Sequence, residues 1–335
     1  MSCSLSNDLP WSALLAAREL LAAGALSLAF AERRGAWTCR DGADAEPDSL
    51  LVEVEPGSLE EYVSPASVAA ARAIYRTNAH GLPSIEATRP NDISLEPTME
   101  SAARVYLPIL IGAARAHRSG SSFVAGHVTQ TLDGRIACEN GQSQWIGNMA
   151  DQHHSHRMRA LLDGVMVGAT TALRDDPRLD VRHVSGPNPR RIVVSGRGRA
   201  VREGKDLRLM QAPGCEIFVD AGLDLGAERQ GVNVHRAPAE DAHLEPAQIL
   251  SKLREVGVHS VYLEGGSSIL SSFLLAGNVD ILQVHIAAMV LGSGLPSLRF
   301  PTVEHVDQGL QLHMDHAVLD GHVLLTCRPN PTGSR

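Results

Sequence analysis

The run Leu263-Glu264-Gly265-Gly266-Ser267-Ser268 has the residue types that bind an anion. It follows the apolar run Ser260–Leu263 and precedes Ile269–Ala276, which has helical spacing. A strand, a glycine-rich turn and a helix start direct backbone N–H groups and the helix dipole toward whatever lies above the turn. A dinucleotide pyrophosphate is the usual occupant. A simple tight turn gives the same pattern, and the full G-x-G-x-x-G fingerprint is absent from the segment.

A second polar segment follows a buried strand that ends at Gly168. Its loop presents the hydroxyl of Thr171, the adjacent carboxylates of Asp175 and Asp176, and Arg182. Carboxylates at a strand end of an α/β protein suit hydroxyl recognition or proton transfer. The same carboxylates would also cap a helix on an ordinary surface loop, so this segment alone leaves both interpretations open.

A third segment, Thr129–Arg135, predicts the end of a strand with a turn at Asp133-Gly134. The polar run Gly141–Trp145 comes next. Trp145 is one of three tryptophans in the chain. It either stacks on a heterocycle or packs against its own domain.

The first 120 residues have a different pattern of apolar residues from the segments above. The spacing of apolar residues predicts helices over Trp11–Arg34, Ser64–Asn78 and Glu100–His117. Leu50–Val54 alternates like a short strand, and His80–Pro97 contains three prolines and is expected to be irregular. We therefore predict a mainly helical N-terminal accessory region, residues 1–120, of unknown role, which ends at a linker over 118–122.

After Phe123, short apolar runs alternate with helical segments. This alternation predicts an α/β domain over residues 121–330, with a sheet flanked by helices. The expected strands are Phe123–Val128, Val165–Val167, Arg191–Val194, Glu216–Val219, Val232–Arg236, Ser260–Leu263, Ile281–Ala287 and Val323–Cys327. The expected helices are Asp151–Leu162, Pro246–Val256 and Ser268–Ala276.

Composition excludes several classes of protein. The 335 residues carry a net charge of −8 and no long Lys/Arg run, which argues against a nucleic-acid partner. Trp11–Phe30 holds Arg18 and Glu19 at its middle, so neither a signal peptide nor a membrane helix is expected. The five cysteines are scattered, and His153, His154 and His156 lack a third ligand of defined geometry. We expect a reduced, cytoplasmic protein without a metal.

The segments, in this order, resemble the reductase domain of the bifunctional riboflavin-biosynthesis deaminase/reductase family. No single motif is specific for this family, but the whole set of motifs in this order is a strong signal for it. The matching pieces are Thr131–Arg135, Gly141–Ile146, Met158–Ala160, Val167–Thr171, Asp175–Pro177, Leu179–Arg182, Asn188–Val194, Leu263–Gly266, Val279-Asp280 and Leu291–Gly294.

The resemblance implies a dihydrofolate-reductase-like mixed sheet, NADPH as cofactor, and a homodimer. It implies reduction of a ribosylamino group to a ribitylamino group on a pyrimidinone 5′-phosphate. By matched position it assigns the substrate side to Ser143, Arg159, Leu179, Arg182 and Glu264. It assigns the cofactor side to Thr129, Trp145, Thr171, Asp175, Ser195, Gly265, Gly266, Ser267, Ser268 and Ile269.

Chemical roles follow from these residue types. Arg159 and Arg182 are suited to hold a phosphate through bidentate, charge-assisted bonds. Glu264 is suited to accept hydrogen bonds from pyrimidine N–H groups or ribose hydroxyls. Opening the ribose ring requires a proton, for which Asp175 is the first candidate and bound water the second. A basic loop at Ser195–Arg199 either binds the 2′-phosphate of NADPH or is a solvated turn.

Several departures from the family pattern limit what the resemblance implies. Residues 1–120 carry neither a His-x-Glu nor a Pro-Cys-x-x-Cys zinc signature, so deamination is not predicted. His127 stands where many relatives have lysine, Ser195-Gly196 where they have Asp-Ser, and Ala288 where proline is common. The exact pyrimidine therefore stays open. A pterin or folate reductase on the same fold and a non-catalytic NADPH-binding or scaffold protein are the alternatives.

Overall fold

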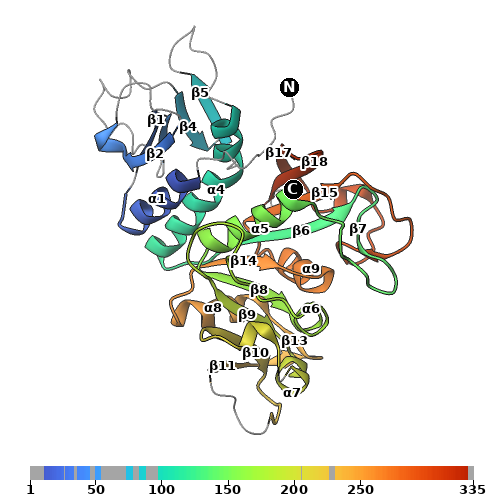
Figure 1. Ribbon diagram of the computed structural model, residues 1–335. Helices are drawn as coiled ribbons and strands as arrows, with labels where there is room; N and C mark the ends of the chain where they lie inside the picture. The colour runs from blue at the N-terminus through green and yellow to red at the C-terminus, as the bar shows by residue number, and fades with distance from the viewer. Residues whose placement is uncertain are drawn as a thin grey trace. The chain divides into compact units, whose positions relative to one another are not determined.

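The computed structural model describes residues 11–25, 27–33, 36–45, 50–53, 73–77, 83–87, 97–204, 206–225 and 231–330. The chain divides into two compact units. The first comprises Met1–Ser119 and His313–Arg328, and the second comprises Gly120–Leu312 and Pro329–Arg335 (Figure 1). Within the described ranges, no helix combines the length and the apolar character that crossing a membrane requires.

The first unit contains a five-stranded sheet with strand order β2-β1-β3-β4-β5. Helix α1 packs on α4, and the Trp11 and Tyr106 rings meet edge to face with centroids 6.4 Å apart. The elements are α1 (Trp11–Ala22), β1 (Ser27–Arg33), β2 (Ala36–Asp41), a 3₁₀ turn (Gly42–Asp44), β3 (Leu50–Glu53), β4 (Ala73–Thr77), β5 (Pro83–Ala87), α4 (Pro97–Ser119), β17 (Leu312–Leu319) and β18 (His322–Pro329).

This sheet was missing from the prediction of a mainly helical N-terminal region. The helix expected over Trp11–Arg34 ends at Ala22, and Gly24 follows with φ +100°. Ser27–Arg33 of that segment form β1, which pairs with β2 on one side and β3 on the other. Backbone pairing on both edges and burial outweigh the helix propensity of its Ala and Leu residues.

Two further expectations for this region are corrected. The last part of the helix expected over Ser64–Asn78 is strand β4, which holds the buried side chains of Ile74 and Tyr75. The residues that precede β4 in that segment lie outside the described ranges. Part of His80–Pro97, expected to be irregular, is the edge strand β5, which starts at a proline, a position that strands tolerate. The short strand expected at Leu50 is confirmed as β3.

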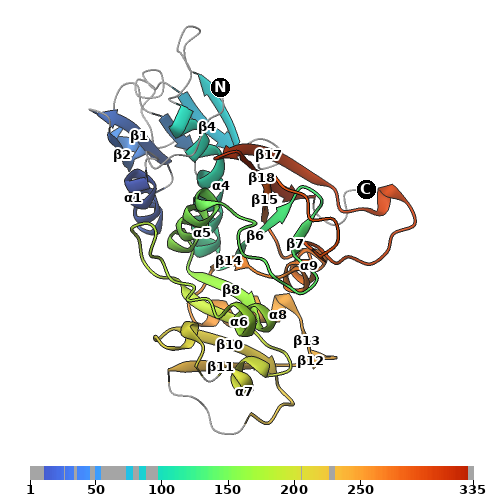
Figure 2. The same cartoon turned by 45° about the vertical axis from the view of Figure 1, so that its right-hand side comes forward.

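The second unit is built on a parallel sheet whose strands lie in the order β11-β10-β9-β8-β14-β6-β15 (Figures 1 and 2). Its sheet strands are β6 (Phe123–Thr131), β8 (Gly164–Gly168), β9 (Arg190–Val194), β10 (Cys215–Asp220), β11 (Val232–Ala237), β14 (Ser260–Glu264) and β15 (Ile281–Ala287). The other elements are β7 (Arg135–Ala137), β12 (Ala239–Glu240), β13 (His243–Leu244), β16 (Leu295–Pro296), α5 (Met149–Leu161), α6 (Ala169–Asp175), α7 (Arg199–Glu203), α8 (Pro246–Glu255) and α9 (Ser267–Leu275), with 3₁₀ turns at Arg208–Met210 and Val306–Gln308.

The predicted α/β sheet flanked by helices is confirmed. All eight expected strands are present, and the three expected helices are α5, α8 and α9. The eighth strand, β18, is grouped with the first unit and not with the rest of the predicted 121–330 domain. Local chemistry explains their bounds. The Asn148 side chain caps α5 by accepting from the Asp151 backbone N–H at 2.9 Å, and Pro246 stands at the first position of α8.

A buried carboxylate ties three strands together at one edge of this sheet. Glu216 on β10 is fully buried and accepts from Arg190 Nη1 at 2.6 Å and from Asn233 Nδ2 at 3.1 Å, while His235 Nε2 lies 2.7 Å away. Burial by itself would raise the pKa of Glu216, but these donors lower it to about 2. The carboxylate is therefore a structural element of this edge.

Candidate functional site

A cavity of about 930 Å³ lies at the carboxyl ends of β6, β8, β9 and β14. Ligand sites of open α/β sheets lie at this edge, and the volume is typical of a small-molecule pocket. The lining includes most of the residues that the sequence placed in a site. These are Thr129, Ser143, Trp145, Thr171, Asp175, Ser195, Glu264, Gly265, Gly266, Ser267, Ser268 and Ile269.

The turn between β14 and α9 presents backbone donors to this cavity. Gly266 is the N-cap of α9 with extended backbone, and the Leu270 N–H makes a bond to the Gly266 carbonyl at 3.4 Å. The amides of Ser267, Ser268 and Ile269 come before that bond in the helix, where backbone N–H groups lack intrahelical acceptors. With the helix dipole they form a site suited to an anion.

Glycines allow the backbone of neighbouring strands to approach closely here. A Cβ placed on Gly265 would lie 2.8 Å from Ile269 Cγ2 and 3.9 Å from the backbone nitrogen of Gly168. A Cβ on Gly266 would lie 3.5 Å from the Thr171 hydroxyl of α6. The cavity floor is therefore bare backbone, which lets a flat or extended ligand lie against it.

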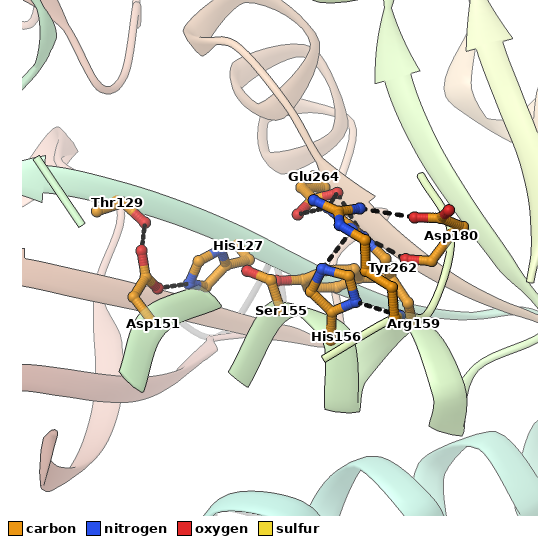
Figure 3. A network of polar contacts seen from close by, with 10 residues as sticks. His127, Thr129, Asp151, Ser155, His156, Arg159, Asp180, Tyr262 and Glu264 are labelled. Carbon is orange, nitrogen blue, oxygen red and sulfur yellow. Dashed lines mark hydrogen bonds and ion pairs between the residues drawn. The ribbon is translucent and has the colours of Figure 1, made fainter. Parts of the chain in front are cut away.

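Glu264 ends strand β14 and is held by Arg159 of α5 (Figure 3). Arg159 Nη2 donates to both carboxylate oxygens at 2.6 and 2.7 Å, and its Nε donates at 3.1 Å. Its Nη1 donates to the Asp180 carbonyl at 3.2 Å and lies 3.4 Å from His156 Nε2. Burial alone would lower the pKa of Arg159, but Glu264 outweighs it and raises that pKa. The guanidinium thus fixes the carboxylate that borders the cavity.

Arg159, Leu179 and Arg182 lie outside the cavity lining that the described residues form. Leu179 is buried with φ +55°, a left-handed conformation that is costly for leucine. The guanidinium of Arg182 is half exposed and pairs with Asp180 Oδ1 at 2.6 Å. The Arg182 backbone N–H donates to His156 Nδ1 at 3.0 Å. The predicted pair of phosphate-binding arginines is close together around His156, but one of them already binds Glu264.

Asp175 ends α6 and borders the cavity, as the sequence suggested. Burial raises the pKa of its carboxyl, and the neighbouring Arg174 opposes that rise. Arg174 also donates from Nη2 to the Asn140 carbonyl at 2.5 Å, which ties the loop before Trp145 to α6. Trp145 borders the cavity with φ 76° and with 81% of its surface exposed. It is therefore a wall of the cavity and not a core residue.

The basic loop after β9 also borders the cavity. Arg197 and Arg199 are in its lining, and Ser195 Oγ accepts from the Ala200 backbone N–H at 3.0 Å. The Arg199 guanidinium pairs with Glu203 at 3.0 Å, one turn along α7. Positive charge therefore stands on the cavity wall next to the α6 and α9 turns.

Sequence reasoning missed a cluster of polar side chains beside the cavity. In the sequence, His127 stands out only as a departure from the family pattern, and Asp151 only as the start of a helix. In the structure both border the cavity, and His127 Nε2 lies 3.4 Å from Asp151 Oδ1 (Figure 3). One available signal was that His127 and Thr129 are two apart on one strand, so their side chains share a face.

Comparison with known proteins adds an independent line of evidence. Residues 122–322 match the RibD C-terminal domain family. The chain is 35% identical over 176 residues, 51% of its length and 79% of the relative's, to the 2,5-diamino-6-ribosylamino-4(3H)-pyrimidinone 5′-phosphate reductase of Methanothermobacter thermautotrophicus. It is 26% identical over 295 residues, 80% of its length and 76% of the relative's, to riboflavin biosynthesis protein RibD of Escherichia coli. It spans about half the length of other curated RibD relatives.

A solved structure shows the same fold. It is a diaminohydroxyphosphoribosylaminopyrimidine deaminase/5-amino-6-(5-phosphoribosylamino)uracil reductase from Thermotoga maritima, with a TM-score of 0.59 and 19% identity. The likeness covers 96% of this chain and 99% of that one, so it takes in the first unit as well as the second.

Proposed function

We propose that this chain, which belongs to the RibD C-terminal domain family, is an NADPH-dependent reductase of a ribosylaminopyrimidine 5′-phosphate. It converts the ribosylamino group to a ribitylamino group. The observation that carries the proposal is the cavity at the strand ends, which collects the predicted cofactor residues together with Glu264. The name of the Methanothermobacter thermautotrophicus relative, a pyrimidinone 5′-phosphate reductase, supports the substrate class.

The residues on the cavity wall fit a nicotinamide dinucleotide phosphate. The amides at the start of α9 and the bare glycine floor suit the pyrophosphate. Arg197 and Arg199 suit the 2′-phosphate, and the exposed indole of Trp145 offers a face for stacking. Bound NADPH supplies a hydride, while the protein orients the reacting groups.

On the substrate side, Glu264 accepts hydrogen bonds from the pyrimidine or the ribose. Arg159 positions Glu264 and is satisfied by it, so we assign the phosphate to Arg182, whose half-exposed guanidinium can turn from Asp180 to a stronger anion. Ser143 borders the cavity on this side, whereas Leu179 is buried outside the lining that the described residues form. The proposal thus revises the paired-arginine hypothesis to one phosphate-binding arginine and one positioning arginine.

The direct test is incubation of the purified full chain with NADPH and the ribosylaminopyrimidine 5′-phosphate. Cofactor oxidation and a ribityl product seen by mass spectrometry are expected. The dephosphorylated pyrimidine should turn over poorly, because Arg182 loses its partner. Oxidation with dihydrofolate but not with the pyrimidine would favour the pterin alternative. NADPH binding without turnover of any of these compounds would favour the scaffold alternative.

We also propose that the chain forms a homodimer through the surface near the β6–β7 turn. Leu132, Met289 and Val290 are exposed there by 69%, 40% and 65%, and the Leu132 N–H binds the Met289 carbonyl at 2.8 Å. A contiguous exposed apolar group of this kind favours association. Sedimentation should give a dimer for the native chain and a monomer for Leu132→Glu. A native monomer at micromolar concentration would contradict this.

A further inference from the structure

A layer of polar side chains separates helix α5 from the sheet next to the cavity. Interfaces between a helix and a sheet are ordinarily apolar, so a buried polar layer needs an explanation. The members are His127 and Thr129 on β6, Asp151 and His154 on α5, and Gln283 and His285 on β15, all of them buried except Thr129, which is partly buried.

Asp151 is the centre of this layer. Its Oδ1 lies 3.4 Å from His127 Nε2 and 3.3 Å from His285 Nδ1, within ion-pair reach of both rings. Its Oδ2 accepts from the Thr129 hydroxyl at 2.7 Å (Figure 3). Burial alone would raise the pKa of Asp151, but His127 and the other neighbours hold it well below its usual range. The group is therefore a buried carboxylate anion.

The other groups that face His127 carry little charge or are already engaged. The His154 ring lies 5.4 Å away, and burial lowers the pKa of His154 to about 3, so it is neutral. The Tyr262 ring lies 5.8 Å away, and burial raises the pKa of Tyr262, so it too is neutral. Glu264 is the register partner of His127 on β14 and is bound by Arg159. Asp151 is thus the carboxylate within ion-pair distance of His127 among the described residues, and it shares that oxygen with His285.

The geometry also places His127 at the cavity. His127, Thr129 and Asp151 border it, whereas His154, Gln283 and His285 lie outside the lining that the described residues form. A carboxylate beside an imidazole favours the protonated ring, and an imidazolium is the usual proton donor near neutral pH.

We propose that His127, held by Asp151, donates the proton that opens the ribose ring. This inference rests on the proposed function and replaces Asp175 as the donor that the sequence favoured. The C1′–O bond breaks with its electron pair on oxygen, and that oxygen takes the proton from His127 to become a hydroxyl. The lone pair of the glycosyl nitrogen forms a C=N bond to C1′. The product of this step is a protonated imine, the acceptor that reduction needs, and solvent water reprotonates His127.

The pH dependence of kcat tests the donor. For the native chain, kcat should fall at alkaline pH as the donor loses its proton. His127→Gln should lower kcat by roughly 10²–10⁴-fold, the usual contribution of a general acid, and should remove the alkaline fall. The substrate KM should change less than about threefold, since the proton moves only in the transition state. Native kcat and an unchanged profile in His127→Gln would overturn the proposal.

Two further variants, Asp151→Asn and His127→Lys, test the donor through the pH at which kcat falls. Asp151→Asn should move the alkaline limb of kcat to lower pH, because the imidazolium loses its counter-charge. His127→Lys should recover part of the rate and move the limb to higher pH, because lysine titrates near 10.4. His153→Gln, two residues after Asp151 on α5 and outside the cavity lining that the described residues form, is the matched control with native kinetics. If His127→Gln does not fold, an unmoved limb in Asp151→Asn overturns the proposal.

A measurement without hydride transfer separates this inference from the proposed function. Ring opening and closing interconvert the two anomers of the substrate, and NMR exchange can follow this in the presence of NADP⁺. The native chain should accelerate the exchange, and His127→Gln should not. NADPH oxidation by the native chain together with equal exchange rates in both proteins would refute the role of His127 alone. Absence of both oxidation and exchange would refute the proposed function and the inference with it.

Discussion

Arg159 gives the sharpest test of how the substrate side is organised. Its guanidinium makes two short bonds to the Glu264 carboxylate and one to the Asp180 carbonyl. Arg159→Met keeps much of the side-chain volume and removes the charge. If Arg159 positions Glu264, this change should lower stability and kcat together. If it held the substrate phosphate, it should mainly raise KM.

The structure sets the size of the stability effect. Breaking a buried ion pair by removing one partner costs about 3–5 kcal/mol. The Glu264 side chain is 20% exposed and that of Arg159 10%, so water recovers part of the loss. We therefore expect about 2–3 kcal/mol, below the fully buried range. For a unit of this size that corresponds to a melting temperature lower by roughly 4–12 °C.

The assay is scanning calorimetry of Arg159→Met, Glu264→Gln and the double variant. The two single changes should not add, because both remove the same pair, and the cycle should return a coupling of about 1–3 kcal/mol. Arg182→Met is the matched control, since its guanidinium is half exposed and its loss should leave the melting temperature nearly native. A native melting temperature in Arg159→Met, with KM raised only for the phosphorylated substrate, would refute the positioning role.

Three other perturbations have defined outcomes. Arg182→Ala should raise KM for the phosphorylated substrate roughly 10- to 150-fold, from about 1.5–3 kcal/mol of lost charge-assisted bonding, with no change for the dephosphorylated compound; equal effects on both substrates would argue against a phosphate contact. Because the pKa of Glu216 is lowered in the folded protein, its carboxylate adds stability above pH ~4.5, and this stability is lost as pH falls toward about 2. Glu216→Gln should therefore lower the free energy of unfolding by about 1.5–3 kcal/mol at neutral pH and make it depend less on pH in acid. The exposed Glu255→Gln should change neither quantity. Gly265→Ala places a Cβ 2.8 Å from Ile269, and strain of about 1–3 kcal/mol at the first turn of α9 should weaken NADPH binding in calorimetry; a native Kd would show that the turn does not contact the cofactor.

Elements with strong local signals could be predicted from the sequence. The strand β15 has the bounds Ile281–Ala287 that its apolar run predicted, and α8 starts at the predicted proline. Strand β17 was missed because its run Leu312–Leu319 mixes histidines and an aspartate with apolar residues and its burial is irregular. The short helices α6 and α7 have too few residues for a period to emerge.

The residues of the candidate site likewise differ in how far they could be predicted from the sequence. The glycine turn after Leu263 and the residues around Thr171 are consecutive in sequence, so a motif could find them. The Arg159–Glu264 pair joins residues 105 positions apart, and nothing local indicates that the two side chains satisfy each other. The Asp151 contacts with His127 and His285 likewise join three separate elements. Such partners become visible only once the sheet order is known.

The polar contacts between α5 and the sheet determine how precisely the helix is positioned. Asp151, His154 and Arg159 lie along this helix, and each meets a polar partner on a different strand: His127 on β6, Gln283 on β15 and Glu264 on β14. An apolar interface tolerates a small shift of the helix at little cost. Shifting α5 along its axis by one turn, about 5.4 Å, would break all three polar contacts and leave the partners unsatisfied. This polar layer therefore fixes the position of α5 along the sheet, and it protects the reacting groups from misplacements of about 1 Å, which can cost roughly 10²-fold in rate.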